Sequence, residues 1–121
     1  MAAAREFFAA LLGWTYAELP GMGHTIRAGG RDIGGLFDLA HPSTPPGTPP
    51  QIGVMVKVES ADETARQAAA LGGQARPPFD VGPAGRLAVL HDPLGANIDA
   101  WEPKALQGTD VDTAVHGAPS W

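Results

Sequence analysis

Apolar residues at the start of the chain follow the period of an α-helix. Phe7, Phe8, Leu11 and Leu12 form one stripe, which predicts a helix over residues 2–12. Gly13 comes next, and a glycine in this place commonly ends a helix. A second helix is predicted from Ser60 to residue 71, because Ser60 and Glu63 make a capping-box pattern and Gly72-Gly73 follows.

Alternating or continuous apolar runs predict strands in the rest of the chain. The expected strands cover residues 14–19, 24–28, 32–39, 52–58, 74–76, 79–81, 85–91 and 96–101. Gly29-Gly30 joins two of them as a hairpin dipeptide. The segment HPSTPPGTPP, residues 41–50, holds five prolines that cannot donate to a sheet, so we expect an extended linker there.

The two halves of the chain have similar sequence patterns, as an internal repeat would. AALLGWTYAELP matches AALGGQARPPFD, and the pair HTIRAGG and LFDL matches RLAVLHDPLG and IDAW. Each half therefore reads helix, strand, strand, strand. The second half has the strand IGVMVKV before its helix, and the first half lacks an equivalent.

Composition narrows the class of protein. A chain of 121 residues with 44% apolar and 17% charged residues is expected to be globular. It has no cysteine, which excludes disulfides, thiolate metal sites and a catalytic thiol. The net charge of -5 argues against nucleic acid or an anionic membrane as a partner. No apolar run approaches the roughly 18 residues of a membrane helix. The opening MAAAREFF lacks the order of a secretory signal, so we expect a cytoplasmic protein.

These segments carry a resemblance to a known family. The doubled βαβββ order, the opening FFAALLGW, the helix ending in LGG and the tail GRLAVLHDPLGANIDAWEP resemble the vicinal oxygen chelate superfamily. That superfamily includes glyoxalase I, bleomycin-resistance proteins and extradiol dioxygenases. Within it, the chain is most similar to actinobacterial-type glyoxalase-like proteins of two tandem domains. The resemblance covers residues 7–102 and implies an α+β fold, in which paired βαβββ modules form a curved mixed sheet around a cavity.

The resemblance also implies where a divalent metal would bind. Its ligands would come from the first and last strands of each module, which places Asp99 and Asp38 at two ligand positions. The usual histidine before the second helix aligns with Gly53, and Gln51 lies two residues earlier. Trp121, in a tail strand over residues 113–121, falls near the fourth position. Two of the four ligand positions, those of Gly53 and Trp121, therefore lack a metal-binding side chain. We expect Asp99 to line the cavity without holding a catalytic metal.

The residues themselves indicate a binding cavity. No histidine pair has the spacing of a local zinc motif. Aromatic, apolar and polar side chains on the strands could hold a small organic molecule. The candidate ligand-binding residues are Trp14, Tyr16, His24, Phe37, Met55, Phe79, Asp99 and Trp101. For Phe37 and Trp101, packing beneath the helices is the competing interpretation.

Two classes of function stay open. The first is a metal-independent, glyoxalase- and bleomycin-resistance-like protein that binds a small molecule. The alternative is a divalent-metal-dependent lyase or dioxygenase, with Asp99, Asp38 and Gln51 as candidate ligands. No catalytic residue is assigned.

The missing first strand sets the expected organisation. We expect residues 1–104 to form the glyoxalase-like domain and residues 105–121 a linker or complementing strand. The tail would fill the empty place in its own chain or in a partner, giving a homodimer, because an open sheet edge invites aggregation. A third alternative is that the chain is a fragment of a tandem protein.

Overall fold

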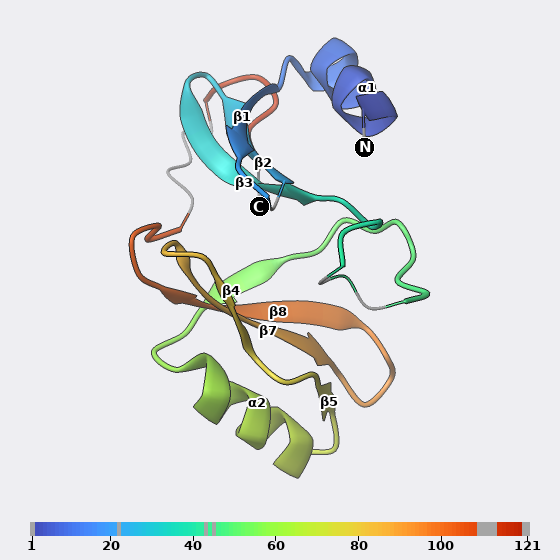
Figure 1. The fold of residues 1–121 in the computed structure, drawn as a ribbon, viewed down its shortest axis with the longest axis vertical. Helices are drawn as coiled ribbons and strands as arrows, with labels where there is room; N and C mark the ends of the chain where they lie inside the picture. Colours follow the sequence, from blue (N-terminus) through green and yellow to red (C-terminus); the bar gives the residue numbers. More distant parts are fainter. Residues whose placement is uncertain (1, 22, 43, 45, 109–113, 120–121) are drawn as a thin grey trace. The chain divides into compact units, whose positions relative to one another are not determined.

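A computed structural model describes residues 2–21, 23–42, 44, 46–108 and 114–119. The chain divides into two compact units. The first unit is Met1–Pro50 with Thr109–Trp121, and the second unit is Gln51–Gly108. Each holds one helix and one sheet, so the α+β class is confirmed (Figure 1). The division into domains proposed from the sequence stays a prediction.

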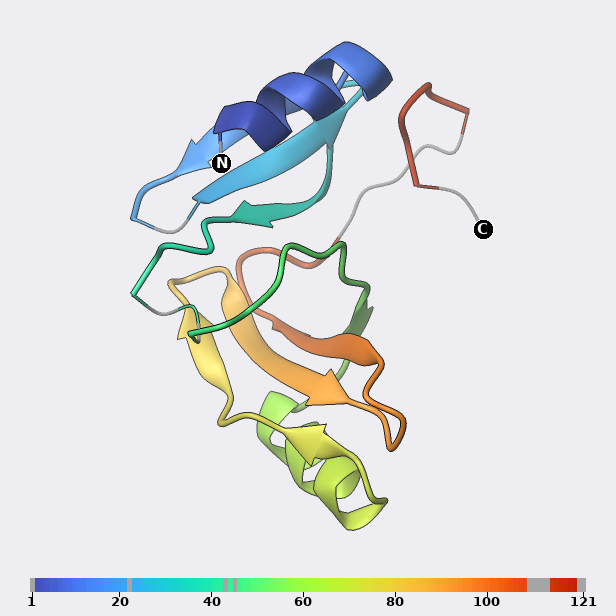
Figure 2. The same ribbon diagram turned by 90° about the vertical axis from the view of Figure 1, so that its right-hand side faces the viewer.

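The first unit consists of a helix and a three-stranded antiparallel sheet. Helix α1 spans Ala2–Leu12, and the sheet order is β1-β2-β3. The strands are β1 (Thr15–Leu19), β2 (Gly23–Ala28) and β3 (Arg31–Phe37). Gly29 and Gly30 have φ of 59° and 78°, as the two central residues of a type I′ hairpin turn require. Figure 2 shows α1 running along this sheet.

Residues 114–119 pack within the first unit. The indole Nε1 of Trp14 donates to the carbonyl oxygen of Gly117 at 2.6 Å. A Cβ on Gly29 would come within 2.7 Å of Val115, so the hairpin turn also touches this segment. Residues 114–117 form turns and a bend, and residues 118 and 119 have no regular structure. Residues 113, 120 and 121 lie outside the described residues, so the strand expected over residues 113–121 stays a prediction.

The second unit follows the order strand, helix, then strands. Its elements are β4 (Met55–Lys57), α2 (Ala61–Ala70), β5 (Gln74–Ala75), β6 (Phe79–Val81), β7 (Gly85–His91) and β8 (Asn97–Pro103). The sheet order is β4-β8-β7-β5, with β6 on β7. β4 runs parallel to β8, and the other pairs are antiparallel. This mixed, open sheet is consistent with the expected βαβββ module.

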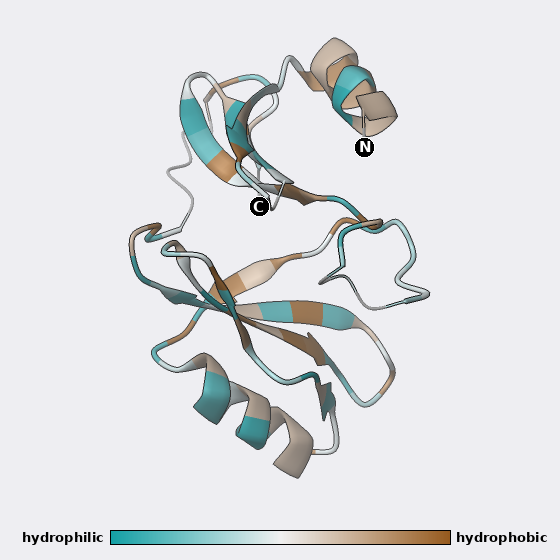
Figure 3. Ribbon diagram, viewed as in Figure 1, coloured by the Kyte–Doolittle hydropathy of each residue, from teal (hydrophilic) through white to brown (hydrophobic). Residues whose placement is uncertain are grey.

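Small side chains form the core of the second unit. Helix α2 buries Ala61 and Ala65 against Ala88 and Leu90 of β7 and Ala100 of β8. Alanines on both surfaces let the helix backbone approach the sheet closely, and they leave little room for a larger residue. Polar and apolar residues alternate in the first half of β8 (Figure 3), as expected for a strand with one face against a helix.

The predicted start of α2 is confirmed in part. The Ser60 hydroxyl accepts a hydrogen bond from the backbone N–H of Glu63 at 3.2 Å, as an N-cap does. The Glu63 carboxylate bonds Arg66 and Gln67, where the capping-box pattern would have turned it back to Ser60. Neither helix in the described part of the chain is long and apolar enough to cross a membrane.

One predicted strand is much shorter in the structure. The run over residues 52–58 forms a strand only at Met55–Lys57, where it pairs with residues 99–101 of β8. Ile52 is 85% exposed, and the backbone bond from Asp99 N to Val54 O continues the contact beyond the strand. Apolar composition predicted a longer strand because it does not show how far the partner strand extends.

Candidate functional site

The sheet of the second unit has one face away from α2. Side chains alternate along a strand, and Ala88 and Ala100 face the helix. Their neighbours Val89 and Asp99 therefore point to the opposite face, which we call the open face. Register places Met55, Asp99 and Val89 in one row across this face.

A second row lies beside the first on the open face. Lys57, Trp101, Leu87 and Phe79 are paired in register across four strands. The structure thus brings four of the predicted ligand-binding residues onto one face: Met55, Phe79, Asp99 and Trp101. Two of them, Met55 and Phe79, keep about two fifths of their surface exposed.

Trp101 packs inside the protein. It is only 7% exposed, and its indole N–H donates to the carbonyl oxygen of Leu106 at 3.0 Å. A Cβ on Gly85 would lie 2.5 Å from the Trp101 ring, so the ring rests on that glycine. Trp101 therefore forms the floor of the open face, on the side away from α2.

Asp99 lies half-buried at the middle of the open face. Asn97 Nδ2 donates to Asp99 Oδ1 at 3.2 Å, and the Oδ1 atom of Asn97 is buried without a partner among the described residues. Burial raises the pKa of the Asp99 carboxyl, and the Asn97 hydrogen bond, the Leu90 backbone and the nearby His91 partly offset this rise. The pair therefore presents hydrogen-bond acceptors in a partly apolar setting.

Few metal donors lie around Asp99 in the described part of the chain. A Cβ built on Gly53 would lie 3.8 Å from Asp99 Oδ2 and 3.5 Å from Asn97 Nδ2, so the aligned position faces Asp99 but brings no donor. Gln51 is exposed and lies outside β4. No group of three or more His, Cys, Asp or Glu side chains suited to a metal is found in the described ranges. His91 lies opposite Asn97 in the β7–β8 register, so the strong metal donors near Asp99 among the described residues are one carboxylate and one imidazole, fewer than the three or more protein ligands typical of zinc and iron sites.

In the first unit, Tyr16 and His24 lie beside α1. Their rings meet edge to face at 6.4 Å between centroids, and Arg5 of α1 lies 3.2 Å from His24 Nε2. Trp14 stacks on Phe8 at 5.2 Å. Phe37 pairs in register with Gly23, the neighbour of His24, so it points to the other face of this sheet. The structure therefore does not bring Phe37 together with Tyr16 and His24.

Asp38 forms a turn directly after β3. Its Oδ1 accepts from the backbone N–H of Ala40 at 2.9 Å, and its carbonyl oxygen accepts from His41 N and Thr44 Oγ1. The Ala40 bond is that of an Asx turn, and the His41 bond closes a β-turn. Whether Asp38 also binds a ligand stays a prediction.

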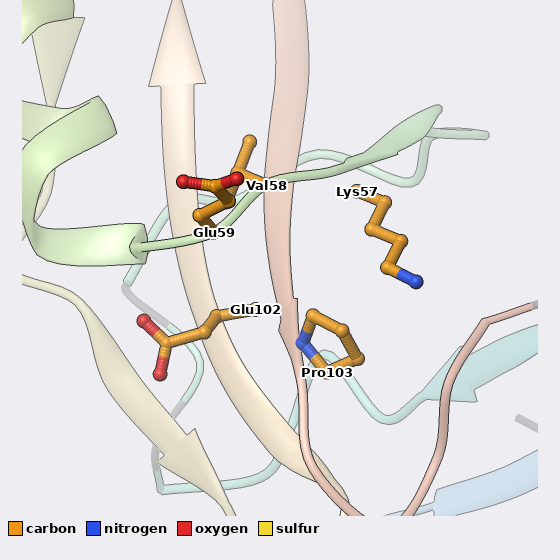
Figure 4. Close-up of a pocket in the computed structure, with 5 residues that line it drawn as sticks. All are labelled: Lys57, Val58, Glu59, Glu102 and Pro103. Carbon is orange, nitrogen blue, oxygen red and sulfur yellow. The ribbon is translucent and has the colours of Figure 1, made fainter.

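Sequence reasoning missed a hollow at the carboxyl ends of β4 and β8. It has a volume of about 520 Å³ and is lined by Lys57, Val58, Glu59, Glu102 and Pro103. In Figure 4 the carboxylates of Glu59 and Glu102 point away from the Lys57 ammonium group. Glu102 Oε1 accepts from the first backbone N–H of α2, at Ala61, at 2.9 Å. Glu102 therefore stabilises the helix start, and no sequence motif marks this hollow.

Two kinds of curated protein are similar to this chain. Over 106 residues it is 30% identical to the proteins named "Putative glyoxylase CFP32" of Mycobacterium bovis and Mycobacterium tuberculosis. That alignment covers 83% of this chain and 40% of each relative. The chain is also 29% identical over 136 residues to the anthracycline biosynthesis protein DnrV of Streptomyces peucetius, covering 100% of this chain and 49% of that one. No family model matches.

These relatives support the vicinal oxygen chelate superfamily. The similarity extends over both units, which agrees with the resemblance seen in residues 7–102. The chain spans between two fifths and one half of the length of these curated relatives. Its relation to the tandem-domain members stays a prediction.

Proposed function

We propose that this glyoxalase-like chain binds a small organic molecule on the open face of the second unit, without a catalytic metal. The observation that carries the proposal is the Asn97–Asp99 pair. Among the described residues no donor reaches the buried Asn97 Oδ1, and the exposed Met55 pairs in register with Asp99 on the same face. A buried acceptor of this kind costs free energy unless a donor reaches it.

The chemistry of the face indicates the class of ligand. Met55 and Phe79 offer apolar surface, and Asn97 and Asp99 offer acceptors. An apolar or aromatic molecule bearing hydroxyl or amine groups would satisfy both. The similarity to a protein named for anthracycline biosynthesis supports an aromatic, hydroxylated ligand.

The position of Gly53 supports binding without metal. A ligand-donating side chain there would stand next to Asp99, and glycine leaves that space to the bound molecule. The competing proposal, a metal-dependent lyase or dioxygenase, would need donors from residues other than those around Asp99.

Titration with doxorubicin, a hydroxylated aromatic compound, tests the proposal through its fluorescence. Met55→Ala and Asn97→Ala should each weaken binding by about tenfold, because each removes a contact of about 1–2 kcal/mol. Leu94→Ala is the matched control, since Leu94 is 95% exposed in the β7–β8 turn. Equal affinities in all four proteins, or no binding by the unaltered protein in a wider screen of hydroxylated aromatics, would contradict the proposal.

A further inference from the structure

Three buried polar atoms without partners lie together in the first unit. They are Arg5 Nε on α1, Tyr16 Oη on β1 and His24 Nδ1 on β2. Within the described residues, the Asn97 amide oxygen is the other side-chain atom with this property. Buried polar atoms are normally paired, so a cluster of three needs a physical explanation.

Contacts between the three side chains fix their arrangement. Arg5 Nη1 lies 3.2 Å from His24 Nε2, and the rings of Tyr16 and His24 meet edge to face. In the β1–β2 register, Tyr16 is opposite Ile26 and His24 is opposite Glu18, so the two aromatic residues are diagonal neighbours on one face. Arg5 reaches that face from α1.

The Arg5 contact sets the hydrogen-bond roles of these groups. A guanidinium can only donate, so His24 Nε2 is the acceptor in this contact, and the tautomer that fits it has its hydrogen on Nδ1. Arg5 Nε–H and the Tyr16 hydroxyl are donors as well. All three unpaired atoms therefore offer a hydrogen to an acceptor, and one of the groups is a cation.

A cavity of about 260 Å³ lies beside this cluster. It is lined by Ala2, Arg5, Glu6, Ala9 and Tyr16. Among the side chains that line it, those of Arg5 and Tyr16 carry hydrogen-bond donors. The volume exceeds that of one water molecule several times over and suits a small ligand.

We propose that this cavity binds a small carboxylate. The oxygens of a carboxylate accept from Arg5 Nε–H and the Tyr16 hydroxyl, and the His24 ring holds the guanidinium in place through its Nε2 contact. Glu6 carries a negative charge at the same cavity, so it repels a divalent phosphate more than a monovalent carboxylate. All residues of this site belong to the first unit.

NMR titration of the full chain tests this site, with sodium acetate as the probe at constant ionic strength. The Arg5 Nε–H and His24 ring signals should shift along one saturation curve. Tyr16→Phe should weaken acetate binding by about tenfold, and Arg5→Gln should abolish the saturable shift. Arg27→Gln is the matched control, because Arg27 is an exposed cation paired with Asp32 in the same unit.

Three results would overturn the carboxylate site. One is a shift that does not saturate, or that is the same in Arg5→Gln and the unaltered protein. Another is tighter binding of inorganic phosphate than of acetate, which would assign a different oxyanion. The third is a lower midpoint of urea unfolding for Tyr16→Phe with unchanged acetate affinity, which would give the hydroxyl a structural role only.

Discussion

The Asp99 carboxyl is partly removed from water on the open face of the second unit, and burial raises its pKa. The folded state therefore holds the proton more tightly than the unfolded chain does. Below the ordinary Asp pKa of about 3.9 both states are protonated, and as the pH rises through the folded pKa the protein loses stability. Asp99→Asn removes this loss. The variant should have the higher thermal midpoint at neutral pH, and the difference should shrink as the pH falls toward 4.

Thermal unfolding followed by circular dichroism, from about pH 4 to neutral pH, measures the sign of the difference in thermal midpoint between Asp99→Asn and the unaltered protein. The Asn97 contact can persist in Asp99→Asn, so the comparison isolates the charge. A variant less stable than the unaltered protein at neutral pH would show that Asp99 is stabilised as an anion. A difference that does not change with pH would show that folding does not raise the pKa of Asp99.

Gly85 is the glycine on which the Trp101 ring rests. A Cβ there would lie 2.5 Å from both the ring and the Glu102 carbonyl oxygen, so the backbone must move to accommodate it. We predict that Gly85→Ala destabilises the protein by about 1–3 kcal/mol. Gly53→Ala is the control, because its Cβ meets nothing closer than 3.5 Å and should change stability by about 0.5 kcal/mol or less. Urea unfolding measures both, and equal effects would mean that the Trp101 contact is not tight.

At the scale of an element, α2 depends on small residues against the sheet. Ala65→Val and Ala69→Val carry the same cost in helix propensity, but only Ala65 faces the core. We predict that Ala65→Val destabilises the protein by about 1–3 kcal/mol more than Ala69→Val, because the extra methyl groups have no space against β7 and β8. Urea unfolding measures both variants, and equal midpoints of unfolding would contradict tight packing at Ala65.

The sequence predicted elements well where local chemistry determines them. The helix that Gly13 ends, the Ser60 cap and the Gly29-Gly30 turn are each determined within a few residues, and the structure confirms them. The apolar stripe of this helix is not buried, since Phe7 and Leu11 are 59% and 57% exposed. The length of β4 was not predictable, since it depends on pairing with β8, which lies more than forty residues further along the chain. The alternation of side chains along a strand correctly predicted that Asp99 and Trp101 lie on one face of β8.

The candidate site was predictable in part for the same reason. Residue type and the alternation of side chains along strands pointed to Asp99, Met55 and Phe79. The burial of Trp101 was not predictable, because it depends on the loop that ends at Leu106. Arg5 was missed, because nothing in the α1 sequence shows that it reaches His24 on β2. Long-range contacts between helix and sheet are not visible in a local pattern.

At the scale of the whole molecule, the second unit has its own helix, sheet and core. We predict that residues 51–108 expressed alone unfold cooperatively on heating, with slow hydrogen exchange in β7 and β8. A chain of this length buries a limited apolar area, so its stability should be modest. A fragment without a cooperative transition or protected amides would show that the second unit needs the rest of the chain.

We propose that the chain binds a small molecule through its own side chains, without a metal. The most direct test is the affinity for a hydroxylated aromatic ligand such as doxorubicin, measured with excess chelator and again with added zinc, nickel or manganese. We predict the same dissociation constant in every condition, because the residues around Asp99 provide acceptors for the ligand and no donor at Gly53 for a metal. Binding that disappears in chelator and returns with a divalent metal would contradict the claim and favour the metal-dependent enzyme.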